Sequence, residues 1–286
     1  MAKGILQQVR MIVTDLDGTL LGRNSEVVPE NAAALRRAAA QGLIVAFASG
    51  RLPAVCSRIA LNAGLTGCRI IGMNGAMIWD APYGGVIRET FYPRPLAEAV
   101  VGILRAEGCV YNVYTTGGVY TNRRMDDEEA DRFRRRFSIA GVPVVIAEDA
   151  GERALSVSVA KFLVKQGDTA EGFRRARQQV SALPGIYLTA SSADNFEVMQ
   201  DGIGKAEAVR LLAARLSISM DSVMAFGDFD NDIGMLKACG YPVAMGNASD
   251  AAKNAAKYIT ADHMAGGVGY AVDALLDGRL DALQKA

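Results

Sequence analysis

The stretch MIVTDLDGTLL, Met11 to Leu21, places two carboxylates one residue apart at the end of an apolar run. Residues 9–14 are mostly apolar and rich in β-branched side chains, which predicts a buried strand. Side chains alternate along a strand, so Asp15 and Asp17 point the same way if the extended path continues. Two such charges about 4 Å apart repel by about 4 kcal/mol at an effective dielectric constant of about 20. A chain tolerates that cost where a cation or a reaction needs it; an Asx-turn or a helix cap is the structural alternative.

Composition restricts the classes of function. The length of 286 residues predicts one large or two medium domains, and 31 basic against 31 acidic residues give no support for binding nucleic acid or a membrane surface. No apolar run approaches the roughly 18 residues of a membrane span, and the start lacks the features of a signal peptide, so we expect a cytoplasmic protein. None of the four scattered cysteines forms a C-x-x-C pair, which predicts reduced, buried thiols at Cys56, Cys68, Cys109 and Cys239.

Strands and helices alternate in the first part of the chain. Apolar runs at 43–48 and 69–74 predict two further strands, and a helix that begins at Pro29 and ends before Gly42 separates the first two. This alternation predicts a parallel sheet with helices on its faces. After Gly202 the same rhythm resumes, with expected helices at 204–216, 231–239 and from Ser249, and expected strands at 222–227, 241–245 and 258–260.

The middle of the chain has a different pattern. A hairpin around Tyr83-Gly84-Gly85 is followed by an α+β module with an antiparallel sheet. Helices are expected near 95–107, 126–139 and 168–181, and strands near 109–115, 142–146, 155–164 and 185–190. We therefore expect an α/β core, residues 1–82 and 191–286, that is split in sequence by an inserted module at 83–190.

A second acidic group ends another expected strand. The stretch VMAFGDFDND supplies Asp228, Asp230, Asn231 and Asp232. An EF-hand is excluded, because its sixth and twelfth positions would be Ile233 and Cys239 instead of glycine and glutamate. If both strand ends lie side by side, up to four carboxylates converge and need a divalent cation. Oxygen ligands without histidine or cysteine indicate Mg²⁺, and such a site suits a phosphate substrate.

Two further segments could hold an anion. FASGR places Ser49 and Gly50 after the second expected strand and just before a helix, where a hydroxyl and backbone N–H groups form an anion cradle. DGIGKAEAV places Lys205 at the start of a helix, which is unusual because cations favour the other end. A bound anion would compensate for that position, and ordinary turn chemistry is the alternative for either segment.

DLDGTL, SGR, GK and GDFDND, in this order, resemble the four motifs of the haloacid dehalogenase superfamily. The tail VAMGNASDAAKNAAKYIT is similar to the Cof-type branch, in which an α/β cap is inserted between the second and third motifs of a Rossmann-like core. The surroundings of the lysine depart from the family pattern, since Asp201 and Ala206 replace a lysine and a glycine.

The resemblance implies a role for each motif. Asp15 would attack phosphorus to give an aspartyl-phosphate, and Asp17 would protonate the leaving oxygen and then activate water. Ser49, Gly50 and Lys205 would hold the phosphoryl group. The Mg²⁺ ligands would be Asp15, the backbone carbonyl of Asp17, and Asp228, with Asp232 orienting that shell. Asn74, Arg51 and Asn231 are further candidates for contact with the substrate.

The expected activity is therefore Mg²⁺-dependent hydrolysis of a small phosphorylated metabolite, with the inserted module closing over the site. Sugar phosphates are favoured by family analogy, and a nucleotide, a flavin or pyridoxal phosphate is left open. A phosphomutase, which passes the phosphoryl group to a second hydroxyl, is the alternative within enzymes. A signalling receiver is the non-enzyme alternative, although receivers have no inserted module of this size. We expect a monomer or a weak homodimer.

Three other features are expected to be structural. DDEEADRFRRRF, residues 126–137, contains four arginines, but acids in its first turn and bases in its last indicate a solvated helix. His263 is expected to be incidental, and GGVGY near 267 is expected to form a turn.

Overall fold

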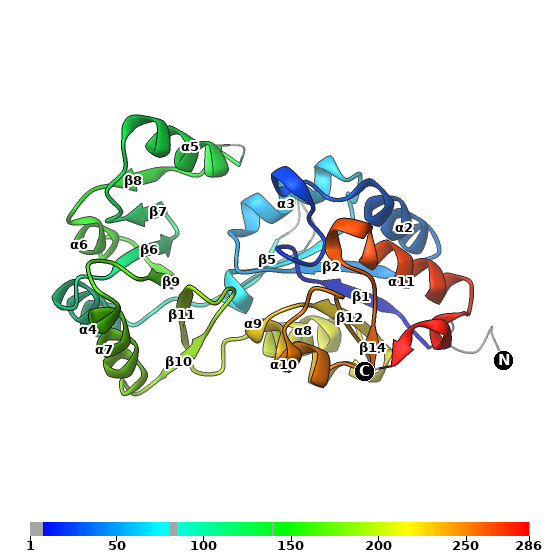
Figure 1. Cartoon of the computed structure of the whole chain (residues 1–286). Coiled ribbons are helices and arrows are strands. Elements are labelled where there is room, and N and C mark those ends of the chain that lie inside the picture. Colours follow the sequence, from blue (N-terminus) through cyan, green and yellow to red (C-terminus); the bar gives the residue numbers. More distant parts are fainter. Residues whose placement is uncertain (1–7, 81–84, 139, 286) are drawn as a thin grey trace. The chain divides into compact units, whose positions relative to one another are not determined.

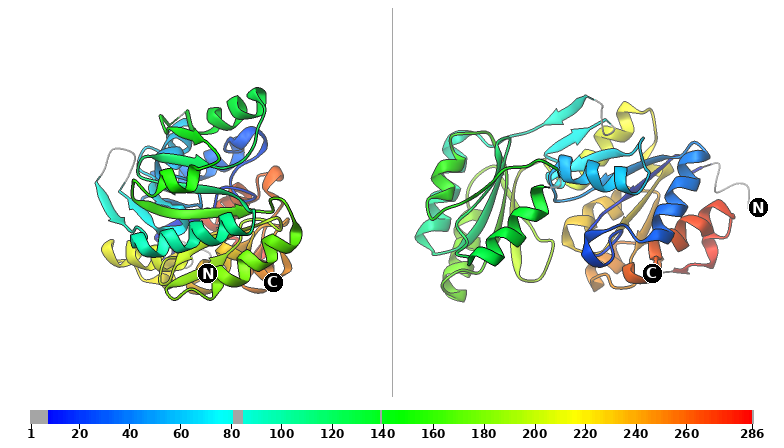
Figure 2. Two further views of the ribbon diagram at one scale, coloured as in Figure 1. Left: turned by 90° about the vertical axis from the view of Figure 1, so that its left-hand side faces the viewer. Right: turned by 90° about the horizontal axis from the view of Figure 1, so that it is seen from above.

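The computed structural model describes residues 8–80, 85–138 and 140–285 and divides into two compact units. The first unit contains Met1–Arg88 and Gly204–Ala286, so both parts of the split sequence build it, and the second contains Glu89–Ile203. In Figures 1 and 2 the blue segments and the orange-to-red segments accordingly lie together in the first unit, whereas the green segments form the second.

The first unit is built on one sheet. Its strands within the described residues are β1 (Met11–Thr14), β2 (Ile44–Ala48), β3 (Arg69–Gly72), β4 (Met77–Trp79), β5 (Val86–Glu89), β12 (Val223–Gly227), β13 (Tyr241–Ala244), β14 (Tyr258–Ile259) and β15 (Gln284–Lys285). They lie in the order β15-β14-β13-β12-β1-β2-β3-β4-β5. The strands from β14 to β3 pair in parallel, whereas β15 pairs antiparallel with β14 and β4 pairs antiparallel with β3. The predicted parallel sheet is confirmed.

The register of the central strands aligns their carboxyl ends. Thr14 at the end of β1 is the partner of Phe226 in β12 on one side and of Phe47 in β2 on the other. The whole of β1 is buried, as expected for a β-branched, apolar strand with a neighbour on each side. The residues that follow these strands, Asp15 and Asp228 among them, therefore emerge at one edge of the sheet, where open α/β sheets bind ligands.

Helices lie on both faces of this sheet (Figure 1). They are α2 (Pro29–Ala40), α3 (Pro53–Asn62), α8 (Lys205–Arg215), α9 (Asp230–Ala238), α10 (Asp250–Asn254) and α11 (Gly267–Leu276). The helix α2 packs against α11, and α8 packs against α9. Proline occupies the first position of α2, where its missing N–H costs nothing, and Gly42 follows the helix with a φ of 87°, which glycine adopts without strain.

The second unit has its own sheet and core. Its strands are β6 (Val110–Thr115), β7 (Gly118–Thr121), β8 (Val144–Ile146), β9 (Val159–Lys165), β10 (Ile186–Thr189) and β11 (Asn195–Gln200), in the order β10-β11-β9-β6-β7-β8. All neighbours pair antiparallel except β7 and β8. The helices are α4 (Arg94–Ala106), α5 (Asp127–Ser138), α6 (Ala150–Ala154) and α7 (Ala170–Ser181). Residues of α4 and α7 form a hydrophobic cluster with Phe162, Phe196 and other strand residues.

The expected α/β core with an inserted α+β module matches this architecture, but the boundaries differ. The second unit ends at Ile203 and not near residue 190, because β11 pairs with β9 and β10 in the second sheet. It begins at Glu89, and the expected hairpin turn at Tyr83 and Gly84 lies outside the described residues. The strands flanking that turn, β4 and β5, are neighbours in the first sheet.

Smaller expectations also differ. The sequence GGVGY is not a turn: Gly266 has a φ of 71° and α11 begins at Gly267. The strand β14 is not the last, because β15 pairs with it antiparallel after α11. The strand β7 and the short helix α6 were absent from the expectation.

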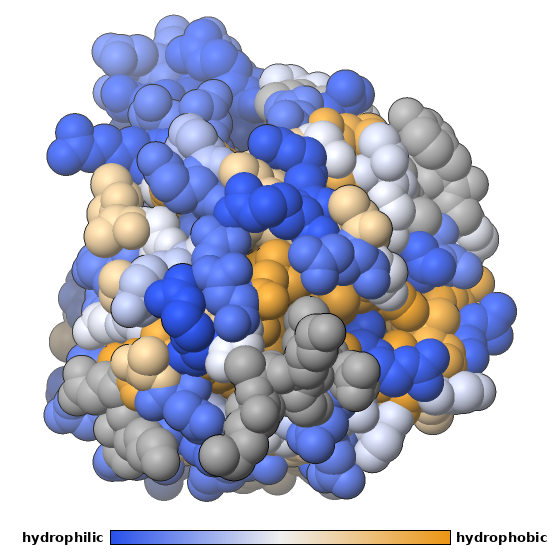
Figure 3. Space-filling model, turned by 90° about the vertical axis from the view of Figure 1, so that its right-hand side faces the viewer, coloured by the Kyte–Doolittle hydropathy of each residue, from blue (hydrophilic) through white to orange (hydrophobic). Residues whose placement is uncertain are grey.

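The expectations about surface helices, cysteines and membrane spans agree with the structure. The arginine-rich helix α5 is solvated: Glu128 and Arg132 form an exposed ion pair at 3.3 Å, and Asp131 and Arg134 form another at 3.4 Å. All four cysteines are buried and free, as expected. On the face of the molecule in Figure 3 hydrophilic side chains predominate, with apolar ones between them. Within the described ranges every helix is too short or too polar to cross a lipid bilayer.

Candidate active site

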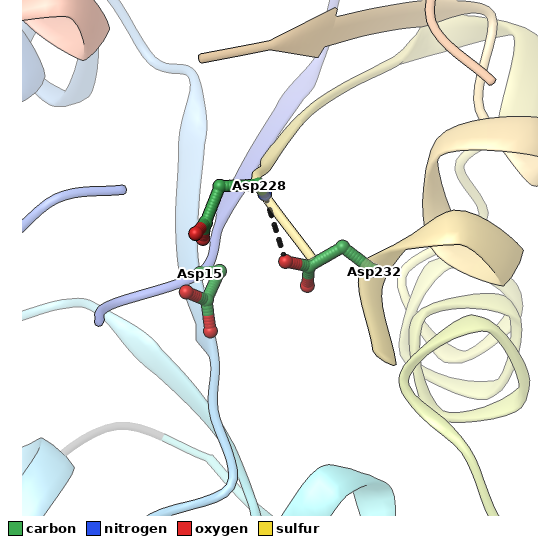
Figure 4. A group of neighbouring side chains, drawn as sticks. All are labelled: Asp15, Asp228 and Asp232. Atoms are coloured by element: carbon green, nitrogen blue, oxygen red, sulfur yellow. Dashed lines mark hydrogen bonds between the residues drawn. The ribbon is translucent and has the colours of Figure 1, made fainter. Parts of the chain in front are cut away.

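Three carboxylates gather at the carboxyl edge of the central strands. Asp15 follows β1, Asp228 follows β12, and Asp232 lies in the first turn of α9. One ligand oxygen from each lies within 4.8 Å of those of the other two, and the three groups face one another in Figure 4. Asp232 is held in place because its Oδ2 accepts a hydrogen bond from the backbone N–H of Asp228 at 3.0 Å. The parallel register thus assembles a set of oxygen donors from residues more than 200 positions apart.

Burial and mutual repulsion shift the titration of this cluster. Burial is the largest cause that raises the pKa of Asp15 well above its usual range; the charges of Asp232 and Asp228 add to it, whereas Lys205 opposes it. Burial, followed by the charge of Asp232, raises the pKa of Asp228 to about 6. Burial disfavours the charged form of each carboxyl group, and the neighbouring carboxylates add to that effect. Three carboxylates and one lysine thus gather in the cluster.

That lysine is Lys205, the first residue of α8. Its side chain is fully buried, and its Nζ donates hydrogen bonds to Asp15 Oδ1 at 2.5 Å and to Asp232 Oδ1 at 2.7 Å. Burial alone would lower the pKa of Lys205, but the charges of Asp15 and Asp232 outweigh burial and raise it. The anion that a lysine at a helix N-terminus requires is thus supplied here by two carboxylates.

Asp17 does not join the cluster, contrary to the expectation that Asp15 and Asp17 project together. Its side chain is 57% exposed and forms two hydrogen bonds with Arg51, from Nε at 2.7 Å and from Nη2 at 2.5 Å. The physical reason is that the extended path ends at Asp15: the chain turns from Leu16 onward, and Gly18 has a φ of 79°. Among the described residues, three carboxylates and not four converge.

The other expected residues lie at the ends of β2 and β3. Ser49 is buried, and its Oγ accepts from the backbone N–H of Arg51 at 3.2 Å. Its carbonyl accepts from the N–H of Asn74 at 2.9 Å. Asn74 is buried with a φ of 52°, and its Oδ1 accepts from Nδ2 of Asn231 at 3.3 Å, which connects β3 with α9. Gly50 lies between Ser49 and Arg51, at the same edge.

Two residues that support the cluster were missed. Thr19 donates through Oγ1 to Asp228 Oδ1 at 2.8 Å, and Asn247 donates through Nδ2 to the carbonyl of Gly18 at 2.8 Å. A Cβ at Gly18 would overlap the carboxylate of Asp228, so this turn requires glycine. Thr19 lies within DGTLL and Asn247 three residues after the end of strand β13, so a search of the segments that follow each strand of the sheet would have found both.

Comparison with known proteins gives consistent results. A family model for haloacid dehalogenase-like hydrolases matches residues 12–272. The chain is 30% identical to the phosphatase YwpJ of Bacillus subtilis, with 94% of this chain and all of the relative covered. It is 29% identical to a 5-amino-6-(5-phospho-D-ribitylamino)uracil phosphatase of the same organism, YcsE, with 92% and 94% covered. The crystal structure of a haloacid dehalogenase-like hydrolase from Bacteroides thetaiotaomicron has a TM-score of 0.78 and 26% identity, with 93% and 98% covered.

Proposed function

Because this chain belongs to the family of haloacid dehalogenase-like hydrolases, we propose that it is a magnesium-dependent phosphatase of the Cof type acting on a small phosphorylated metabolite. Its enzyme class is that of the phosphoric monoester hydrolases, as the names of its relatives indicate. The observation that carries the proposal is the convergence of Asp15, Asp228, Asp232 and Lys205 at one edge of the sheet.

The cluster suits a divalent cation. Three carboxylates against one ammonium would leave an excess of negative charge, and after burial the neighbouring carboxylates contribute to the raised pKa values of Asp15 and Asp228. The donors are all hard oxygens, which favour Mg²⁺ over softer metals. We assign Asp15, Asp228 and the backbone carbonyl of Asp17 as its ligands, with Asp232 orienting them. A bound Mg²⁺ would supply positive charge to the phosphoryl oxygens there.

Asp15 is the proposed nucleophile. Its carboxylate attacks phosphorus, the bond from phosphorus to the leaving oxygen breaks, and an aspartyl-phosphate forms. Asp17 gives its proton to the leaving oxygen, so the alcohol departs neutral. Lys205, which binds one oxygen of Asp15, stands beside the group being transferred, and Ser49 with the N–H of Gly50 offers further donors.

Hydrolysis completes the cycle. Asp17, now ionised, takes a proton from water, whose oxygen attacks phosphorus and releases Asp15 and inorganic phosphate. The exposed position of the Asp17 side chain suits both tasks, because a proton donor and acceptor needs contact with an alcohol and then with water. Without a positioned water the same intermediate would pass its phosphoryl group to a second hydroxyl, which is the phosphomutase alternative.

For the substrate we propose a phosphorylated sugar or a sugar-like alcohol. The support is the family analogy and the relative whose named substrate carries a phosphorylated ribityl chain. The second unit, Glu89–Ile203, is proposed as the cap that selects the substrate. A receiver-like phospho-acceptor is disfavoured, because receivers have no inserted unit of this size.

The test is phosphate release from a chromogenic aryl phosphate and from a panel of phosphorylated metabolites. Asp15→Asn should lower kcat by at least about 10⁴-fold, because the nucleophile is lost. Removal of metal with EDTA should abolish activity, and added Mg²⁺ should restore it. Asp221→Asn, a change at an exposed aspartate in a turn before β12, is the matched control and should be unaffected. Wild-type rates from Asp15→Asn would overturn the nucleophile, and transfer to sugar without free phosphate would favour the mutase.

A further inference from the structure

Arg51 connects two loops beside the acidic cluster. Its guanidinium donates hydrogen bonds to both oxygens of the Asp17 carboxylate, and its Nη2 also donates to Ser25 Oγ at 3.1 Å. A planar guanidinium that bonds both oxygens of a carboxylate fixes the plane and the direction of that carboxylate, which a lysine cannot do. The orientation of Asp17 is thus determined by a residue 34 positions away in the chain.

The backbone of Arg51 is itself fixed. Its N–H donates to Ser49 Oγ at 3.2 Å, and its carbonyl accepts from the N–H of Met73 at 2.9 Å. The peptide on which the side chain depends is therefore tied to the ends of both β2 and β3. Arg51 is accordingly a rigid support for Asp17, which lies on a turn.

The third partner of Arg51 is held in an uncommon conformation. Ser25 belongs to a 3₁₀ turn, Arg23–Ser25, and has a φ of 58°, which costs a residue other than glycine about 1–2 kcal/mol. An antiparallel bridge between Leu21 and Val27 closes the loop around it. The hydrogen bond from Arg51 to the Ser25 hydroxyl stabilises this strained backbone, because the bond forms only when Ser25 is held at this position.

Without the hydrogen bonds from Arg51, the Asp17 carboxylate would be attracted to a cation bound at the neighbouring acidic cluster. It lies two residues after Asp15, beside a site whose oxygen donors suit a divalent cation. A free carboxylate there would be drawn to the cation as a further ligand, and an oxygen bound to a metal is a poor carrier of a proton. The structure instead shows the Asp17 carboxylate bonded to Arg51 and outside the group formed by Asp15, Asp228 and Asp232.

We propose that Arg51 is a positioning residue that reserves Asp17 for proton transfer by holding its carboxylate out of the metal site. This inference rests on the proposed phosphatase function. As the bond from Asp15 to phosphorus forms and the bond to the leaving oxygen breaks, one oxygen of Asp17 releases its proton to the leaving oxygen. The other oxygen stays bonded to Arg51, and the same oxygen that lost the proton later regains one from the attacking water.

Leaving-group dependence distinguishes this role from direct binding of phosphate. The ratio kcat/KM reports the steps up to departure of the leaving group. An alkyl phosphate such as a hexose phosphate needs a proton on its leaving oxygen, whereas p-nitrophenyl phosphate releases a stable phenolate without one. A residue that holds the phosphoryl group affects both esters equally, but a residue that acts through Asp17 affects chiefly the alkyl ester.

The experiment measures kcat/KM for both esters with Arg51→Gln, Arg51→Lys and the wild type in Mg²⁺. We expect Arg51→Gln to lower kcat/KM by about 100-fold with the alkyl ester and by less than about threefold with the aryl ester. Arg51→Lys should be intermediate with the alkyl ester. The inhibition constant of inorganic phosphate should stay within about twofold of the wild type. Arg37→Gln, which removes the exposed ion pair with Asp273, is the control for loss of an arginine and should change neither ester.

A double-mutant cycle measures whether Arg51 acts through Asp17. In an Asp17→Asn background, Arg51→Gln should cause no further loss with the alkyl ester, because the group that it positions is already absent. An equal loss with both esters together with a weaker phosphate inhibition would show that Arg51 binds phosphate, and would overturn the inference. Additive losses in the cycle would overturn it as well. If the wild type released no phosphate from any ester, the proposed function would fail, and this inference with it.

Discussion

Lys205 in the first unit and Lys161 in the second are both buried against carboxylates, but the two arrangements differ in charge balance. Lys205 bonds Asp15 and Asp232 and has Asp228 nearby. Lys161 in β9 bonds Glu197 of β11 at 2.6 Å, and each of these two side chains is 1% exposed. One lysine therefore faces three carboxylates in the first unit, whereas the pair in the second unit is neutral.

The difference in charge balance indicates which of the two buried groups would take up a cation. The charges of Lys161 and Glu197 balance each other, and both groups have further partners. Glu197 also accepts from Ser191 Oγ at 3.1 Å, and Lys161 lies 5.4 Å from the centre of the Tyr114 ring. The cluster in the first unit has three carboxylates for one lysine, and the divalent cation proposed above would balance its charge. Burial of charge alone is thus poor evidence for a metal site, and the imbalance of charge is the informative observation.

The largest expected effect compares the two lysines. Lys161→Met and Lys205→Met should each destabilise the protein by about 3–5 kcal/mol without metal, because carboxylates are left buried and uncompensated. Added Mg²⁺ should raise the Tm of Lys205→Met by more than it raises the wild-type Tm, because a cation replaces the lost ammonium. The Mg²⁺-induced shift of Lys161→Met should equal that of the wild type.

Thermal melts in EDTA and in Mg²⁺ measure both shifts. The matched control is Lys161→Met with Glu197→Leu, which removes both charges and should recover most of the lost stability. Equal Mg²⁺-induced shifts in the two single variants would break the comparison, because the first unit would then have no special need of a cation.

The second effect is a pH-dependent gain in stability. Burial raises the pKa of Asp228 to about 6, whereas an unfolded aspartate titrates near 4. Between these values the folded state keeps a proton that the unfolded state has lost, so the metal-free protein loses stability as pH rises and levels off above about pH 6. Asp228→Asn removes this loss. We expect the variant in EDTA to be more stable than the wild type by about 1–3 kcal/mol at pH 8, and the difference to vanish near pH 4.

The measurement is Tm against pH in EDTA, repeated with Mg²⁺, which should reverse the order because the variant lacks one of the proposed metal ligands. Lower stability of Asp228→Asn at pH 8 in EDTA would contradict the assignment of excess negative charge to the cluster.

The smallest effect calibrates the other two. The exposed pair of Glu128 and Arg132 on α5 belongs to neither buried site, and Arg132→Gln should cost less than about 0.5 kcal/mol. Its effect should also diminish in high salt. A loss above about 1 kcal/mol in the same melts would show that surface ion pairs in this protein are stronger than usual, and the buried pairs would need comparison against that higher baseline.

Much of the fold followed from the sequence because its patterns are local. Hydrophobic periodicity and helix starts at proline predicted β1, β2, β3 and α2, and the order of four motifs predicted the family that the comparison confirmed. The second unit was predicted in outline only. Its boundary depends on β11, whose pairing with β9 joins residues some 30 positions apart, and such partners cannot be identified from local pattern.

The candidate site shows the same limit. The acids at the two strand ends were predictable, because parallel strands end at a common edge. The direction of Asp17 was not, since it depends on the turn at Gly18 and on the guanidinium of Arg51. Likewise, Lys205 could be placed near an anion from its position in α8, but that the anions are Asp15 and Asp232 follows only from tertiary packing.

The split of the first unit also has a consequence for synthesis on the ribosome. Strand β1 ends at Thr14, and its neighbour β12 begins at Val223, so roughly 200 residues separate two adjacent central strands. At about 5–20 residues per second the ribosome needs roughly 10–40 s to deliver that neighbour. For this interval one apolar edge of the nascent sheet lacks its partner and is open to pairing with another chain. Chaperone demand during translation should therefore be concentrated on the first ninety residues.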